Sequence, residues 1–281
     1  MSKMNFTMYT GFSEKIRECG IEQAADYAKG LGYTSVELYE EILPSWSYAI
    51  PDVASARKVK AVLDEKGLSV ACYSVYADIW QKEETVQTLI ELVDIAYELG
   101  SPFFHHTLLP SAVPSYEEGI QAAVDAAARI ADYAATLSII CIYEDQGQYV
   151  NGVEGFEGFW AELKKRCANV GICGDLGNIL YVNEMPEPFF KAFIKDIRHV
   201  HVKDYLWKKG TISPGKYWNR GKADSWLRET MVGSGVVDFE ACMKILKEAG
   251  YEGAFALELN HPEPYEAGVQ QAMAYLKRYW L

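Results

Sequence analysis

The sequence predicts an α/β fold, a single (β/α)8 TIM barrel, and three observations lead to this prediction. Short apolar runs alternate strictly with longer amphipathic segments, and there are eight of each. Several amphipathic segments end in glycine, which is typical of helix C-termini. The length of 281 residues is also usual for one such barrel.

The expected strands are short runs rich in branched and aromatic residues, and the expected helices are the segments between them. The strands are predicted at residues 5–11, 35–40, 68–76, 102–108, 139–145, 170–176, 198–204 and 254–260. The helices are predicted near residues 13–30, 52–67, 83–100, 116–137, 154–168, 186–196, 238–250 and 264–280.

A doubly wound open sheet is the main alternative to the barrel. It requires a glycine-rich phosphate loop after an early strand, and the segment YTGFSE after the first strand is not such a loop. No linker or low-complexity stretch divides the chain, so we expect one domain over residues 1–281.

Composition narrows the class of protein. The net charge of −12 argues against nucleic acid as the main partner. No apolar run reaches the roughly 18 residues of a membrane span, and the first residues lack the pattern of a secretion signal. The six cysteines show no CxxC spacing and are typical of reduced core thiols. We therefore expect a cytoplasmic protein that does not bind a membrane.

Polar side chains gather at the ends of the expected strands. All five histidines lie there, and many carboxylates do as well. In a barrel of this kind, the carboxyl ends of the strands line the active site. These residues are His105, His106, His199, His201, His261, Glu37, Glu40, Glu144, Asp145, Asp175, Asp204 and Glu258.

Four of these residues lie late on four consecutive strands, namely Glu144, Asp175, His201 and Glu258. Three carboxylates in one barrel mouth would repel one another unless some stayed protonated. A divalent cation removes this repulsion, and a neutral imidazole completes a set of four ligands. The sequence therefore predicts one divalent metal ion, either Mn²⁺, Mg²⁺, Co²⁺ or Zn²⁺.

One expected strand alternates valine with three polar residues, so that His199, His201 and Lys203 share a face. His199 lies deeper, and we expect it to have a structural role behind His201. Lys203 lies nearer the mouth. It would contact a substrate or a carboxylate, with a salt bridge to Asp204 or Glu258 as the equal alternative.

Two further positions stay open at this point. His105 and His106 are adjacent, so only one of them can point into the barrel, and the apolar residues before them do not decide which. A substrate hydrogen bond from one of them is expected. Glu37 either reaches the mouth or forms a structural ion pair.

Four segments follow one another along the chain, namely IYED, GDLGN, HVHVKD and ALELN. Together with the approach to the last strand at 233–259, they resemble the xylose isomerase-like barrels. That family includes sugar and sugar-phosphate isomerases and epimerases, inosose-processing enzymes and relatives of endonuclease IV. The resemblance extends over nearly the whole chain, and the carboxyl-terminal half is its most specific part.

The resemblance implies that Glu144, Asp175, His201 and Glu258 bind one metal ion and that the two glutamates move protons. The implied function is a divalent-metal-dependent isomerase or epimerase of a sugar-like hydroxycarbonyl substrate. The cation would stabilise an enediolate after one glutamate removes a proton, and the other glutamate would return it. The alternative is a lyase that dehydrates an inosose-like or keto-sugar substrate.

Two positions depart from the pattern of the ketohexose epimerases in this family. Asn178 stands where they have a histidine, and Trp207 stands where they have an arginine. With His105 and Lys203, these residues are the expected substrate-binding set for a carbohydrate or polyol-derived compound. The additional metal histidines of the endonuclease members are absent. A non-catalytic sugar-binding barrel and a homo-oligomer, common in the family, stay open.

The connection after the seventh expected strand, at about 205–237, is long for a barrel. Over 205–230 it carries six basic and two acidic residues, a net charge of +4, and three of the seven tryptophans. We expect it to lie over the catalytic face as a lid, with an aromatic ring or a basic residue meeting the substrate. A subunit interface is the equal alternative.

Overall fold

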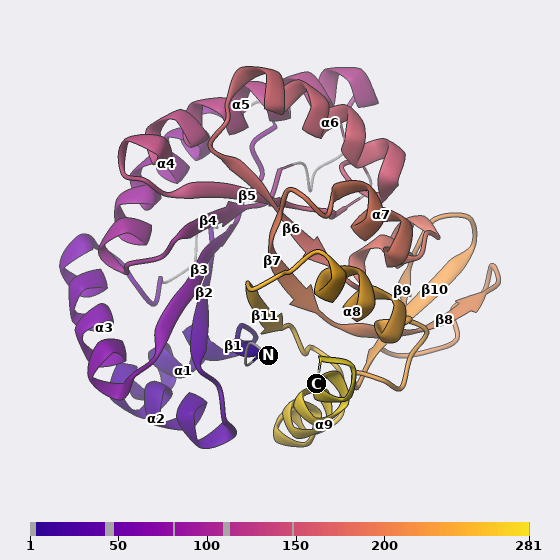
Figure 1. Ribbon diagram of the computed structural model, residues 1–281. Helices are drawn as coiled ribbons and strands as arrows, with labels where there is room; N and C mark the ends of the chain where they lie inside the picture. Colours follow the sequence, from indigo (N-terminus) through magenta and orange to yellow (C-terminus); the bar gives the residue numbers. More distant parts are fainter. Residues whose placement is uncertain (1–3, 43–47, 81, 109–112, 148, 281) are drawn as a thin grey trace.

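A computed structural model describes residues 4–42, 48–80, 82–108, 113–147 and 149–280. Eight parallel strands close into a barrel in the order β1-β11-β7-β6-β5-β4-β3-β2, and helices surround it (Figure 1). The strands are β1 (Asn5–Met8), β2 (Ser35–Glu41), β3 (Ser69–Tyr76), β4 (Phe103–His106), β5 (Ile140–Glu144), β6 (Val170–Asp175), β7 (Ile197–Val202) and β11 (Ala254–Leu257). Each expected strand forms one strand of the barrel, so the predicted fold is confirmed.

The helices follow the predicted ranges with one difference. They are α1 (Phe12–Cys19), α2 (Ile21–Leu31), α3 (Val53–Lys66), α4 (Glu83–Glu98), α5 (Tyr116–Thr136), α6 (Gly152–Arg166), α7 (Pro186–Phe193), α8 (Phe239–Glu248) and α9 (Tyr265–Trp280). The helix expected over 13–30 is two helices, because Gly20 adopts φ 82° and ψ 165° and interrupts it. None of the described helices is long and apolar enough to cross a membrane.

The barrel interior is apolar at its base and polar above it. Cys72, Ile142 and Cys173 form a small buried cluster inside the barrel, with Phe103 and Ile140 packed against it. The larger core lies between the strands and the surrounding helices. Because side chains alternate along each strand, the next inward positions toward the mouth belong to the polar residues at the strand ends.

The segment expected as a long loop forms a small antiparallel sheet in the order β8-β10-β9. Its strands are β8 (Asp204–Lys209), β9 (Asn219–Arg220) and β10 (Ser225–Thr230). It projects beside the barrel (orange in Figure 1). The sequence pattern does not predict these strands, because β9 is two residues long and the segment between β8 and β9 has no regular alternation.

A buried carboxylate fixes the chain between β10 and α8. Asp204 accepts hydrogen bonds from four backbone N–H groups, those of Tyr205 (2.9 Å), Gly233 (3.0 Å), Gly235 (2.8 Å) and Val237 (3.2 Å). A Cβ atom at Gly235 would overlap the Asp204 carboxylate, so only glycine allows this approach. Asp204 therefore joins the small sheet to the segment that leads into the last helix pair.

We expect Asp204→Asn to lower the free energy of unfolding by about 2 to 4 kcal/mol, because an amide offers one acceptor oxygen to four buried donors. Urea denaturation would measure this change. The matched control is Asp238→Asn, since Asp238 caps α8 through one hydrogen bond at the surface and asparagine caps equally well. Equal stabilities of the two variants would contradict this role of Asp204.

Candidate active site

Four side chains predicted from the sequence converge in the barrel mouth. Glu144 ends β5, Asp175 ends β6, His201 lies on β7, and Glu258 directly follows β11. One potential ligand atom from each lies within 4.8 Å of the others. The Nδ1 atom of His201 is 2.9 Å from Glu144, 3.4 Å from Glu258 and 3.9 Å from Asp175.

Strand register explains this convergence. Asp175 lies opposite His201 in the β6–β7 pair, and Ala256, two residues before Glu258, lies opposite His201 in the β11–β7 pair. The four side chains therefore reach a similar height at the carboxyl end of the barrel. Asp175 and His201 are fully buried, whereas the Glu258 side chain keeps 17% of its exposure.

The other nitrogen of His201 is held from below by Glu37, on β2. Glu37 lies 3.2 Å from His201 Nε2 and 2.7 Å from His199 Nε2. Burial acts to raise the pKa of Glu37, but His201 and His199 hold it well below its ordinary value. Because a carboxylate only accepts hydrogen bonds, the Nε2 atoms of His199 and His201 both donate to Glu37. A neutral His201 then carries its lone pair on Nδ1, which faces the converging carboxylates.

The same network orients His105, while both His105 and His106 line the cavity at the barrel mouth. Ser74 donates to Glu37 (2.5 Å), so His105 Nδ1, 3.2 Å away, donates to the Ser74 oxygen. His105 Nε2 lies 3.8 Å from Glu144 and has no hydrogen-bond partner among the described residues. It presents an acceptor lone pair. His106 instead packs edge-on against Tyr143, with ring centroids 5.2 Å apart.

Lys203 forms ion pairs inside the site. Its ammonium lies 2.6 Å from Glu258 and 3.2 Å from Asp175, and it donates to the side-chain oxygen of Asn178 at 3.1 Å. Burial acts to lower the pKa of Lys203, but Asp175 and Glu258 raise it well above the ordinary value. Of the two expected salt bridges, the one to Glu258 is present. Asp204 is occupied by backbone donors instead.

Asn178 connects both halves of the site from the 3-10 helix η1 (Asn178–Val182). Its amide nitrogen donates to Glu144 at 3.0 Å while its oxygen accepts from Lys203. Burial raises the pKa of Glu144 to about 7, although His201 opposes the shift.

The donor set fits a divalent cation. Glu37, Glu144, Asp175 and Glu258 bring four carboxyl groups together, and Lys203 supplies the buried ammonium beside them. The Oδ2 atom of Asp175 is buried, and its nearest charged neighbour among the described residues is the Lys203 ammonium at 3.2 Å. One imidazole nitrogen with three carboxylates is a set that Mn²⁺, Mg²⁺, Co²⁺ and Zn²⁺ accept.

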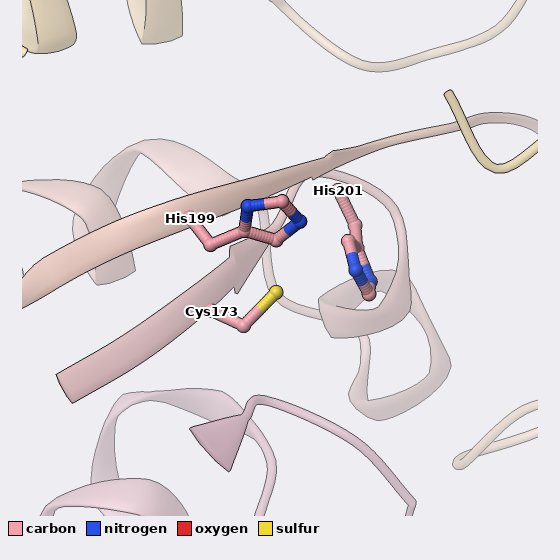
Figure 2. Close-up of side chains that lie close together, drawn as sticks. All are labelled: Cys173, His199 and His201. Atoms are coloured by element: carbon pink, nitrogen blue, oxygen red, sulfur yellow. The ribbon is translucent and has the colours of Figure 1, made fainter. Parts of the chain in front are cut away.

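A second group of potential ligands lies deeper. Figure 2 shows Cys173, on β6, pointing toward His199 and His201, on β7. Burial raises the pKa of the Cys173 thiol, so it stays neutral and is a poor ligand. Both histidines already donate to Glu37. This group is therefore part of the packed floor beneath the site.

A cavity of about 810 Å³ reaches the site at Glu144, whereas Asp175, His201 and Glu258 are not among its described lining residues. His105, Glu144 and Asn178 line one part of it, and Arg220 and Lys222 line another. Trp207 is not among the described residues that line this cavity. It lies on β8, partly buried against the core, with the Lys209 ammonium 5.6 Å from its ring centre.

Tyr9 and Glu229 are site neighbours that the sequence analysis missed. The Tyr9 ring stacks on His201 with centroids 4.6 Å apart, and its phase with buried Thr7 could have indicated this. Glu229, on β10, accepts from the backbone of Asn260, and burial raises its pKa to about 8. No local pattern marks Glu229, since it lies in the small sheet.

Comparisons with known proteins agree with this architecture. The family model described as xylose isomerase-like TIM barrel matches residues 25–279. An inosose dehydratase of Geobacillus thermodenitrificans is 26% identical over 219 residues, which are 71% of this chain and 72% of that protein.

Two solved structures show the same fold. A xylose isomerase-like TIM barrel protein of Mycobacterium smegmatis in complex with magnesium superimposes with a TM-score of 0.74 at 15% identity, over 99% of this chain and 97% of that one. The apo form of 3-keto-D-glucoside 4-epimerase from E. coli gives a TM-score of 0.70 at 18% identity, over 98% of this chain and all (100%) of that chain.

The buried His106 predicts a pH-dependent stability. Burial lowers its pKa from 6.5 to about 4, so the unfolded chain binds a proton in a pH range where the folded protein does not. Stability therefore falls as the pH drops through this range, by about 2 kcal/mol between roughly pH 7.5 and pH 5. His106→Asn should remove this component from urea unfolding curves. An identical pH dependence in wild type and variant would refute it.

Proposed function

The chain belongs to the xylose isomerase-like TIM barrel family, and we propose that it is a divalent-metal-dependent isomerase or epimerase of a sugar-like hydroxycarbonyl compound. The observation that carries this proposal is the convergence of Glu144, Asp175, His201 and Glu258, of which Glu144 lines an open cavity. The 3-keto-D-glucoside 4-epimerase among the similar structures supports the substrate class.

In this proposal Nδ1 of His201 and the carboxylates of Glu144, Asp175 and Glu258 would hold the cation. Bound there, it would polarise the carbonyl group and stabilise the negative charge of an enediolate. The magnesium complex of a structural neighbour supports a cation of this kind. Glu37 would keep His201 Nδ1 free of a proton, since the carboxylate of Glu37 accepts the Nε2 hydrogen.

Glu144 and Glu258 would transfer the protons. Removal of a C–H proton beside the carbonyl by one glutamate and delivery of a proton to carbon by the other, initially protonated, glutamate would isomerise or epimerise the substrate. Asn178 holds Glu144 in place, and Lys203 holds Glu258. His105 Nε2 would accept a hydrogen bond from a substrate hydroxyl, because its lone pair is directed toward Glu144 and the cavity.

A dehydratase is the second candidate, and the similarity to an inosose dehydratase over 71% of the chain favours it. The same enediolate can expel a hydroxyl group from the next carbon. The site then releases water rather than returning a proton to carbon. Both candidates share the proposed metal site and the first proton abstraction.

The first test is the metal content of the purified protein, measured by inductively coupled plasma mass spectrometry. We expect about one divalent ion per chain in the wild type and little in His201→Ala, because that change removes the only nitrogen ligand. His106→Asn is the matched control and should retain the metal. A wild-type protein that takes up no Mn²⁺, Mg²⁺, Co²⁺ or Zn²⁺ would overturn the proposal.

The second test follows exchange of substrate protons with deuterated water over a panel of sugars and inososes. Glu144→Gln and Glu258→Gln should each slow exchange by about a hundredfold or more, since an amide cannot take up the proton. Exposed Glu157→Gln should not change it. Unchanged turnover in both variants would refute the assignment.

The mass of the product separates the two candidate functions. An isomerase or epimerase conserves the substrate mass, whereas a dehydratase lowers it by one water. Mass spectrometry on the same reaction mixtures gives this answer.

A further inference from the structure

We propose that the cavity contains an anion-binding subsite formed by Arg220 and Lys222, so that the substrate carries a phosphate or carboxylate group. This inference rests on the proposed function for the hydroxycarbonyl end of the substrate. Arg220, Gly221 and Lys222 come from the end of β9 and the turn that follows, and they line the same cavity as Glu144.

The backbone of Lys222 is held firmly at the cavity wall. Its N–H donates to the carbonyl of Tyr181 at 2.8 Å, and its carbonyl accepts from the side chains of Asn183 and Ser225, each at 2.8 Å. Tyr181 also lines the cavity. The small sheet is therefore tied to the loop after β6 at the point where it presents its basic residues.

The turn between β9 and β10 is a tight hairpin turn over residues 222–225. Ala223 and Asp224 both have positive φ angles, 47° and 54°, and the N–H of Ser225 donates to the carbonyl of Lys222 at 3.2 Å. Left-handed backbone is unfavourable for alanine. Positive φ at both central residues is the usual conformation of a tight turn between two antiparallel strands, so the hairpin of β9 and β10 accounts for it. Here the conformation fixes the direction from which Lys222 meets the cavity.

The two cations are available to a ligand. The Lys222 ammonium has no ion pair or hydrogen bond within the described ranges. Arg220 pairs with Asp224 at 3.1 Å, but their side chains are 64% and 54% exposed. An ion pair this exposed contributes little, so an anion in the cavity can compete for Arg220. The segment 205–230 has a net charge of +4 in a protein of net charge −12.

The charges on the cavity wall and the volume of the cavity favour one orientation of the proposed substrate. Of the described residues that line the cavity, Glu144 is the acidic one, and it belongs to the wall beside the barrel strands. An anionic group is repelled there and attracted at Lys222 and Arg220. The cavity volume of about 810 Å³ exceeds what one sugar ring fills, which leaves room for a charged substituent beyond the ring.

The test measures binding of inorganic phosphate by ³¹P line broadening and of acetate by ¹H line broadening, on metal-loaded and chelator-treated protein. The variants are Lys222→Ala and the double variant Arg220→Ala/Lys222→Ala. Lys216→Ala is the matched control, since Lys216 lies in the same segment outside the cavity lining. Lys222→Arg retains the charge.

We expect the double variant to bind the preferred anion about tenfold more weakly than the wild type, with Lys216→Ala and Lys222→Arg close to wild type. The anion that shows this dependence identifies phosphate or carboxylate as the substrate group. Anion binding at the cation itself would persist in the double variant, so it does not imitate this result.

Two results would overturn the subsite. Either each anion binds the wild type and the double variant with the same affinity, or neither anion binds the wild type. Either result leaves the metal content and the proton exchange with neutral sugars unaffected. Conversely, anion binding that depends on Lys222 in a protein without metal or proton exchange would support the subsite and overturn the proposed function.

Discussion

The concentration of buried carboxyl groups in the barrel mouth is the constraint on which the rest of the site depends. Glu37, Glu144, Asp175 and Glu258 come from four strands and meet around His201. Removing charges from water is expensive unless each finds a partner. The imidazoles below, the ammonium of Lys203 and the proposed cation share this task. These contacts form only when the strand ends stay in register. The ion pairs therefore depend on the barrel, and they stabilise it in turn.

Glu37 occupies the centre of this arrangement. It receives hydrogen bonds from His199, His201 and Ser74, and through Ser74 it orients His105. The polar network thus extends across the barrel from β2 to β5 through His201 and Glu144. Rigid strands hold the groups that would perform chemistry, whereas the small sheet and η1 supply the groups that would select the substrate. This division is usual in barrels of this class.

Much of the site was accessible to sequence reasoning because parallel strands of a barrel end on one face. The positions of Glu144, Asp175, His201 and Glu258 late on consecutive strands were enough to predict that they meet. The strand count was accessible for the same reason. Tyr9 and Ser74 carried a signal in their phase along the strands, but a polar or aromatic residue at one inward position is too common to be decisive.

The sequence by itself determined the order of strands and helices and the face on which each strand residue lies, since both follow from local periodicity. Tertiary structure decided the rest. It placed His105 rather than His106 beside Ser74, gave Lys203 its carboxylate partners, and brought Arg220 and Lys222 to the cavity. These outcomes depend on contacts between residues far apart in the chain. Local propensity carries no record of such contacts, because they form only when the barrel closes and the small sheet packs beside it.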